Sequence, residues 1–185
     1  NGVYLYQYCI EGRQLLADPC AHDIEWKDPA GHEGHEPFHA RAVLEVGRPP
    51  YAWAVTNFVR PESGRLLIYE FYLEDFVPGG GFTGAVARLD YIRDMGFNAI
   101  EPLPWMEFTT GRSWGYNPAF HYAPESAYGT PDDLKRLIDE AHKRGVAVIM
   151  DAVFNHMDRD SALYQLYGAD YDASPYFREF RGENW

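Results

Sequence analysis

The sequence predicts an α/β protein with a parallel sheet that begins near residue 66 and follows a separate β-rich segment. Three observations support this fold class. The apolar run 146–150 does not alternate with polar residues, which indicates a strand covered on both faces. Strand and helix patterns alternate from residue 66 to 150, as right-handed parallel units require. Residues 1–60 show strand patterns and no helix between them.

The first 60 residues contain several stretches of strand character. These stretches are 3–10, 13–17, 40–46 and 52–59, with a tight turn at Glu11-Gly12 and a polar loop at 22–39. A sandwich of the immunoglobulin type needs about seven strands. We therefore expect this segment to be part of a larger β domain.

From residue 66 onward the elements follow one another in a regular order. The predicted elements are a strand at 66–72, a helix at 82–95 capped by Thr83 and stopped by Gly96, a strand at 97–100, a helix from Thr130 to Arg144, and the strand at 146–150. Thr130-Pro131-Asp132-Asp133 is a strong helix start, because it combines a capping Thr, a Pro at the first position and acids in the first turn.

Composition and charge narrow the classes of partner. The formal net charge of -12 disfavours nucleic acid and anionic membrane surfaces, whereas it costs a neutral polysaccharide nothing. No apolar run reaches the ~20 residues that span a bilayer. The 14 Tyr and 5 Trp residues can fill cores or stack on planar and sugar ligands. Cys9 and Cys20 could lie on adjacent strands, but spacing does not show a bond.

Polar residues follow the last predicted strand where parallel α/β proteins bind ligands. Asp151 ends the apolar run, and Asn155 and His156 follow it. A lone Asp at this place could be structural, bonded to backbone amides or to an Arg. The three residues together favour a site.

Two shorter motifs point to other functions. His35-Glu36-Pro37-Phe38-His39 matches the zinc motif HExxH, but Pro37 interrupts the helix that the motif needs, which favours a polar loop. Residues 79–84 match GxGxxG before a helix, with Glu101 where a ribose-binding acid would lie. Pro78 spoils the tight turn that a dinucleotide site requires, so a flexible turn is the preferred interpretation.

A long loop rich in aromatic residues, 105–118, follows the second predicted parallel strand. Long loops at this end of parallel strands usually carry function. Trp114 and Tyr116 could stack on a sugar ring or pack the loop against the protein, and the residues alone leave both possibilities open.

Together these motifs resemble the α-amylase family of glycoside hydrolases and transglycosylases. The resemblance extends from about residue 66 to 156. It is carried by Trp114-Gly-Tyr116-Asn-Pro118, Tyr128-Gly-Thr-Pro-Asp-Asp-Leu134, His142-Lys-Arg-Gly145 and Asp151-Ala-Val-Phe-Asn155-His156. It implies a (β/α)₈ TIM barrel of which residues 61–156 supply strands one to three. Residues 1–60 then resemble the tail of a β-sandwich, carbohydrate-binding-like module, and 157–185 the start of the insertion after strand three.

The resemblance also implies roles for individual residues. Tyr116 would stack on the sugar at the point of cleavage, and His156 would bond its hydroxyls. Asp151 would hold the active-site Arg or nearby groups rather than attack. Trp114 would contact substrate, and Asn155 matches a residue that ligates a structural calcium in many relatives; no other cofactor is expected.

The chemistry implied is retaining cleavage or transfer of α-1,4-linked glucose units in starch, glycogen or maltooligosaccharides. Such cleavage needs a nucleophile and an acid/base about 5–5.5 Å apart. In the family these are an Asp on strand four and a Glu on strand five, so we expect these residues alone, without the remainder of the barrel, to be inactive. The alternatives are a non-catalytic carbohydrate-binding fragment and a dinucleotide-binding domain.

Overall fold

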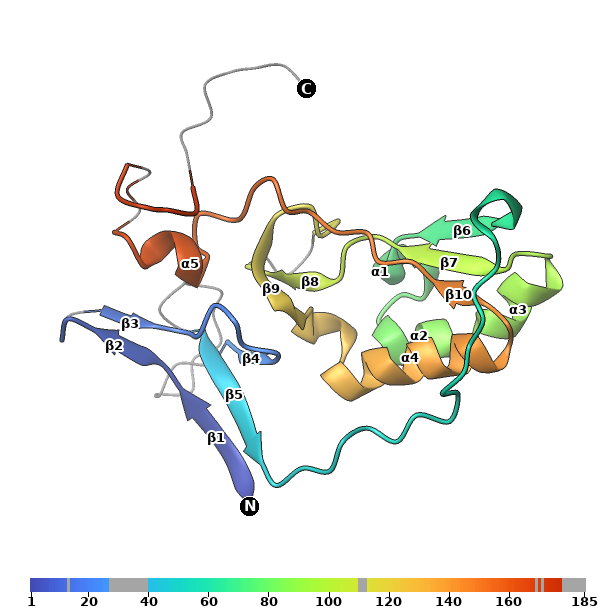
Figure 1. Ribbon diagram of the computed structural model, residues 1–185, viewed down its shortest axis with the longest axis horizontal. Helices are drawn as coiled ribbons and strands as arrows, with labels where there is room; N and C mark the ends of the chain where they lie inside the picture. Colours follow the sequence, from blue (N-terminus) through green and yellow to red (C-terminus); the bar gives the residue numbers. More distant parts are fainter. Residues whose placement is uncertain (13, 27–39, 110–112, 169, 171, 178–185) are drawn as a thin grey trace.

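The computed structural model describes residues 1–12, 14–26, 40–109, 113–168, 170 and 172–177. Its centre is a parallel sheet with strand order β6-β7-β10 (Figure 1). The strands are β6 (Ile68–Phe71), β7 (Ala99–Pro102) and β10 (Ala147–Val148). Ala99 pairs with Ile68 on one side and with Ala147 on the other. The predicted order of three parallel strands is confirmed, although β10 is shorter than the apolar run that predicted it.

Helices cover one face of this sheet (Figure 1). They are α1 (Leu73–Phe76), α2 (Gly81–Val86), α3 (Leu89–Asp94) and α4 (Pro131–Lys143); a further short helix, α5 (Ala162–Gln165), lies after the sheet in sequence. Ile100 of β7, Phe82 of α2 and Leu137 of α4 are fully buried in the same core. No helix in the described part of the chain is long and apolar enough to cross a membrane.

The start of α4 has the geometry that its sequence predicts. The Thr130 hydroxyl accepts a hydrogen bond from the Asp133 backbone N–H at 3.2 Å, and the Thr130 backbone N–H donates to the Asp133 carboxylate at 2.9 Å. Both bonds satisfy backbone donors that a helix start otherwise leaves unpaired. Pro131 occupies the first turn as expected, and His142 and Lys143 lie in the last turn.

The single helix predicted over 82–95 is wrong, because the chain forms α2 and α3 with a break at Ala87 and Arg88. There the backbone N–H groups donate to carbonyls three residues back, which tightens the turn. Thr83 does not cap the helix, since α2 begins earlier, at Gly81, and the Thr83 hydroxyl contacts Asp133 of α4 instead. Gly96 ends α3 at φ 95°, as predicted.

The strand predicted at 52–59 is also wrong. This segment runs as an irregular strap along α4, where the backbone N–H groups of Ala54 and Val55 donate to the Asp139 carboxylate at 3.0–3.1 Å. The Phe58 ring stacks on His142 with a centroid distance of 3.9 Å. Because a helix satisfies these amides, the segment needs no strand partner.

The N-terminal segment forms small antiparallel sheets. Its strands are β1 (Gly2–Tyr6), β2 (Tyr8–Ile10), β3 (Gln14–Leu16), β4 (Ile24–Glu25) and β5 (Arg41–Val46), arranged as β1-β5-β4 and as the hairpin β2-β3. The strand predicted over 3–10 divides at Gln7, whose side chain donates to the Ala40 carbonyl. The predicted tight turn is confirmed: Glu11 and Gly12 both have positive φ, and they lie between the paired residues Ile10 and Gln14.

The N-terminal sheets pack on a β-ribbon inserted between β7 and α4. This ribbon consists of β8 (Met106–Phe108) and β9 (Pro118–Pro124). Phe120 of β9 meets Trp26 edge to face at 6.0 Å and shares a second core with Leu16 and Ile24. The 3-10 turns Ser63–Arg65 and Ser126–Tyr128 lie before β6 and after β9.

Two carboxyl groups, Glu107 and Glu125, are buried where these parts meet, with 0% and 2% of each residue exposed. Glu107 accepts from the Trp26 indole N–H at 2.7 Å and from the Ser126 backbone N–H at 2.7 Å. Glu125 accepts from the backbone N–H groups of Phe108 and Ala127. Together the pair joins the N-terminal segment, the β-ribbon and the turn that leads into α4.

Burial disfavours the ionisation of both carboxyl groups, whereas the hydrogen bond from Glu107 favours the ionised form of Glu125. Burial, followed by the charge of Glu125, raises the pKa of Glu107 well above its usual value. Burial also raises the pKa of Glu125 to about 7, although backbone N–H donors lower it, and the nearby Glu74 charge contributes in the same direction as burial. A proton between the two carboxyls prevents two buried negative charges.

We expect stability to fall as pH rises from about 4.5 to about 7. The pKa of Glu125 is higher in the folded state, so its contribution is complete below 4.5 and is lost as pH passes through about 7. A change of that size corresponds to about 3 kcal/mol. Urea unfolding followed by Trp fluorescence measures this slope. Glu125→Gln should reduce this slope and leave the part that comes from the raised pKa of Glu107. The exposed control Glu62→Gln should not reduce it; an equal slope in both variants would contradict the assignment.

Candidate active site

A hydrogen bond joins the loop before β9 to the end of the third parallel strand. The Tyr116 hydroxyl donates to the Asp151 carboxylate at 2.7 Å, across 35 positions of sequence. Tyr116 belongs to the long loop between β8 and β9, and Asp151 follows β10. The structure therefore brings together two residues that the sequence predicted for the site.

His156 completes this cluster. Its Nε2 lies 2.6 Å from the Tyr116 carbonyl oxygen, so the imidazole holds the backbone of the same residue whose hydroxyl contacts Asp151. The segment between Asp151 and His156 is anchored separately, because His121 Nε2 lies 2.8 Å from the Val153 carbonyl oxygen. Asn117 also donates to Asp158, which lies two residues beyond His156. These bonds hold the strand end and the loop in one arrangement.

The acidic surroundings keep the Tyr116 phenol protonated. The hydrogen bond to Asp151, then burial, and then the charges of Asp151, Glu70 and Glu101 raise the pKa of Tyr116 to about 12. A neutral phenol can donate a hydrogen bond, and the Tyr116 hydroxyl donates to the Asp151 carboxylate. Tyr116 as a whole remains 39% exposed, so it is available to a ligand.

Two further carboxylates, which sequence reasoning did not assign to this site, come from the ends of the other parallel strands. Glu70 of β6 and Glu101 of β7 are direct partners in the sheet register, so their side chains share one face. Burial, then the charges of Glu70 and Asp151, raise the pKa of Glu101. The sequence suggests Glu101 only as a possible ribose ligand. The sequence signal that could have identified both Glu70 and Glu101 is an acidic residue near the end of each predicted parallel strand.

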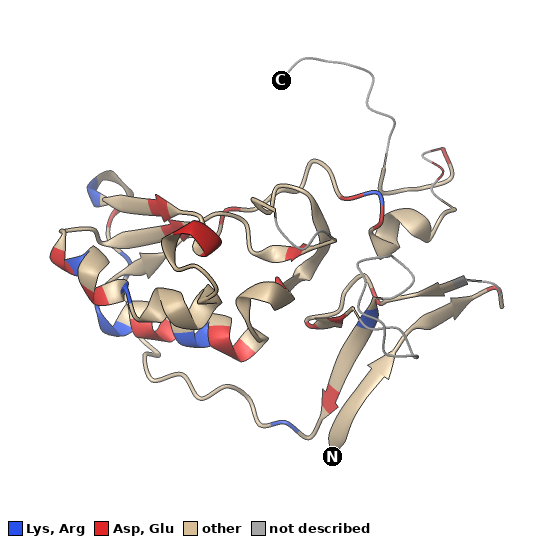
Figure 2. Cartoon of the chain, turned by 180° about the vertical axis from the view of Figure 1, so that it is seen from behind, with Lys and Arg blue, Asp and Glu red and all other residues tan. Residues whose placement is uncertain are grey.

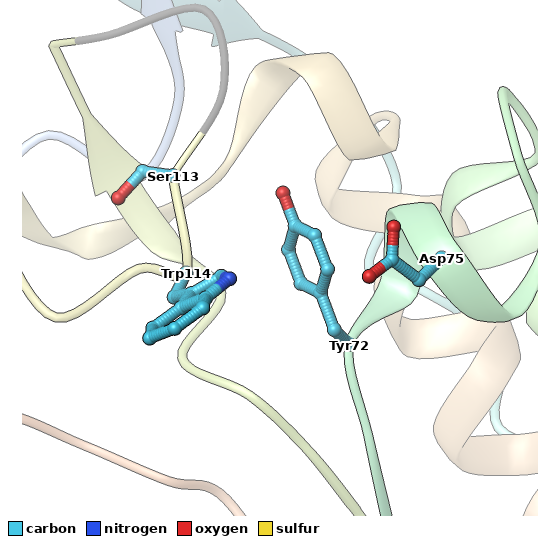
Figure 3. Close-up of a pocket in the computed structure, with 4 residues that line it drawn as sticks. All are labelled: Tyr72, Asp75, Ser113 and Trp114. Atoms are coloured by element: carbon cyan, nitrogen blue, oxygen red, sulfur yellow. The ribbon is translucent and has the colours of Figure 1, made fainter.

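Trp114 lies beside this cluster and faces a separate hollow. It is 68% exposed and lines a hollow of about 360 Å³ with Tyr72, Asp75 and Ser113 (Figure 3). Gly115, between Trp114 and Tyr116, has φ 89°, and a Cβ built on it would lie 2.0 Å from the Pro104 carbonyl oxygen. The loop thus packs against Pro104 through a position that only glycine can occupy.

Asn155 and the HExxH motif are the two places where the sequence suggests a metal ion. Asn155 is exposed. Within the described ranges no group of three or more His, Cys, Asp or Glu side chains could hold a metal ion. The calcium role of Asn155 stays a prediction. The HExxH residues His35–His39 lie outside the described part of the chain, and Cys9 and Cys20 are exposed free thiols.

The glycine run does not have the arrangement of a dinucleotide site. Helix α1 lies between β6 and the glycines, so the glycines do not form the tight turn that follows the strand. The glycines serve packing instead: a Cβ on Gly81 would lie 2.1 Å from the Tyr128 carbonyl oxygen, and Cβ atoms on Gly80 and Gly84 would meet Val77.

Tyr116, Asp151 and His156 belong to the motifs that carry the sequence resemblance, and the structure brings them together at the carboxyl ends of parallel strands. Comparison with known proteins agrees with them. The model of the alpha amylase catalytic domain matches residues 34–181. The chain belongs to the alpha-amylase family.

The matches extend over most of this chain but over less than a third of each relative's own length. A malto-oligosyltrehalose trehalohydrolase from Saccharolobus solfataricus is 31% identical over 97% of this chain and 29% of its own length. The branching enzyme GlgB from Rhodospirillum rubrum is 34% identical over 85% of this chain and 22% of its own. A Salmonella typhimurium crystal structure, provisionally classed as an alpha amylase, has a TM-score of 0.74, with 31% identity over 88% of this chain and 26% of its own. The chain thus spans less than a third of these proteins.

Replacing Gly115 should disturb the site loop more than its backbone angle alone explains. Gly115→Ala must move away from the Pro104 carbonyl, whereas the control Gly79→Ala has a similar positive φ of 69° and open space around it. We expect Gly115→Ala to lower the free energy of unfolding by about 1–3 kcal/mol more than the control, the usual cost of overpacking. Chemical denaturation measures the difference; equal losses would contradict the packing role of Gly115.

Proposed function

We propose that this chain forms part of a retaining glycoside hydrolase or transglycosylase that acts on α-1,4-linked glucose polymers, of the α-amylase or branching-enzyme type. The observation that carries the proposal is the Tyr116–Asp151–His156 cluster at the carboxyl ends of the parallel strands. Family membership supports it, as do relatives named for malto-oligosyltrehalose hydrolysis and 1,4-α-glucan branching. The partners would be starch, glycogen or maltooligosaccharides.

The cluster suggests a division of labour within this proposal. The exposed face of Tyr116 would stack on a sugar ring, with its orientation set by the hydrogen bond to Asp151. His156 would bond sugar hydroxyls with the part of its ring that does not contact the Tyr116 carbonyl. Asp151 would hold Tyr116, and an arginine from the remaining barrel, rather than attack the substrate.

The bond-breaking groups would come from elsewhere in the enzyme. In a double displacement, a carboxylate attacks the anomeric carbon while a carboxylic acid protonates the departing oxygen; water or a second sugar then releases the glycosyl group. We assign these groups to barrel strands four and five. Residues 1–60 would belong to a β-sandwich module before the barrel, for which the antiparallel strands β1, β4 and β5 are the support.

The first test is the intact mass of the native product together with its activity. We expect a product several hundred residues longer, with an Asp and a Glu on the next two barrel strands, that cleaves or transfers α-glucan. The relatives, of which this chain covers 22–29%, motivate that expectation. A native product that ends at Trp185 and cleaves no glucan would overturn the enzymatic proposal and leave carbohydrate binding to be tested.

Two substitutions separate the ring of Tyr116 from its hydroxyl. Tyr116→Phe keeps the stacking face but loses the hydrogen bond to Asp151, which is worth about 1.5–3 kcal/mol when one partner is charged. Tyr116→Ala loses both. In the full-length enzyme we expect kcat/KM to fall for both variants, and further for Ala.

The matched control is Tyr122→Phe, because Tyr122 is a 64% exposed residue of β9 outside the cluster. Steady-state kinetics on a soluble maltooligosaccharide measure the effect. Unchanged kinetics in Tyr116→Ala would remove this residue from the site.

A further inference from the structure

The segment 150–157, which carries two members of the site cluster, has little backbone support. The ladder of the parallel sheet ends with the Ile149 N–H, which donates to the Ile100 carbonyl at 2.8 Å. In the described part of the chain the next backbone hydrogen bond comes only at Asp158, whose N–H donates to the Pro118 carbonyl at 2.9 Å. The conformation of the segment between these two points therefore depends on side-chain contacts.

One of these contacts comes from His121 of β9. Its Nε2 lies 2.8 Å from the Val153 carbonyl oxygen, and because a carbonyl oxygen can only accept, Nε2 carries the proton and donates it. The same imidazole stacks on the Phe154 ring with the centroids 5.3 Å apart and an angle of 14° between the planes. Phe154 remains 76% exposed, so this stacking buries little apolar surface. His121 thus fixes the middle of the segment mainly through geometry.

A second histidine makes the reverse contact. His156 Nε2 lies 2.6 Å from the Tyr116 carbonyl oxygen, so the segment 150–157 gives one imidazole to the chain before β9, and β9 gives the imidazole of His121 to the segment. Neither β9 nor residues 152–157 contain Lys, Arg, Asp or Glu (Figure 2), so no ion pair can join these two stretches. The two imidazoles therefore form a reciprocal clamp between them.

The position of His121 is set by packing outside the parallel sheet. Neighbouring residues of a strand point to opposite faces, so Phe120 faces away from His121. Phe120 is buried in the core that contains the N-terminal strands, where its ring meets the Trp26 indole edge to face with the centroids 6.0 Å apart. Strand β9 therefore has one face fixed in this core and presents the imidazole on the other face.

We propose that His121 is a positioning residue of the active site, which holds the segment 150–157 in the conformation that forms the Tyr116–Asp151–His156 cluster. The inference rests on the proposed function and adds to it a residue that contacts no member of the cluster directly. Reacting groups must be held in a narrow range of positions, and a displacement of about 1 Å can lower a rate about a hundredfold. Loss of the His121 hydrogen bond should therefore slow the reaction without removing a group that contacts substrate.

The test uses two single variants and their combination in the full-length enzyme. His121→Phe keeps a ring that can stack on Phe154 but removes the N–H that the Val153 carbonyl accepts. We expect kcat on a soluble maltooligosaccharide to fall roughly ten- to hundredfold, at a temperature where circular dichroism shows the variant to be folded. The double variant His121→Phe/Tyr116→Phe should lose less than the product of the two single losses, because both changes release the same segment.

The matched control is His22→Phe, since His22 also stacks on a ring of β9, that of Tyr122, with the centroids 6.4 Å apart. It should leave kcat and KM unchanged. Unchanged kinetics in His121→Phe overturn the positioning role, and so do a loss that equals the unfolded fraction and single losses that multiply in the double variant. If the unmodified full-length protein does not act on α-glucan, the proposed function itself has failed and this inference with it, and that outcome is seen before any variant is made.

Discussion

The parallel pairing of β7 with β6 and β10 is the constraint on which the site depends. Ala99 pairs with Ile68 and Ala147, and the Ile149 backbone N–H continues the ladder to the Ile100 carbonyl beyond β10. Parallel strands in this order place their carboxyl ends at one edge of the sheet. Glu70, Glu101 and Asp151 are brought together for that reason, although they are far apart in sequence.

The same constraint explains why the site is acidic and why it contains a neutral phenol. Burial, followed by the charges of Glu70 and Asp151, raises the pKa of Glu101 at the end of its strand. The Tyr116 hydroxyl relieves part of this repulsion by donating to Asp151. An acidic edge with exposed aromatic rings is suited to neutral, hydroxyl-rich ligands, and this agrees with the composition of the whole chain.

The loop before β9 is held by contacts that lie outside the parallel sheet. Gly115 packs on Pro104, and the β-ribbon that carries the loop is fixed by the buried pair Glu107 and Glu125. Trp26 extends this network to the N-terminal sheets. The N-terminal segment therefore contributes to the position of the loop through the ribbon, and a change in its packing can reach the site by this route.

The sequence by itself determined the order of elements, the capping of α4 and three members of the cluster. The signals for these are local: an apolar run, a Thr-Pro-Asp-Asp start, and polar residues directly after a strand. Tertiary structure decided what depends on distant partners. Residues 52–59 form an irregular strap and not a strand, because the Asp139 carboxylate accepts hydrogen bonds from the backbone N–H groups of Ala54 and Val55. Helix α2 begins at Gly81, where the backbone packs against the Tyr128 carbonyl. The sheet register places Glu70 beside Glu101. A periodic sequence pattern predicts which face of a helix or strand a residue occupies, but only the tertiary structure shows which residues it contacts there.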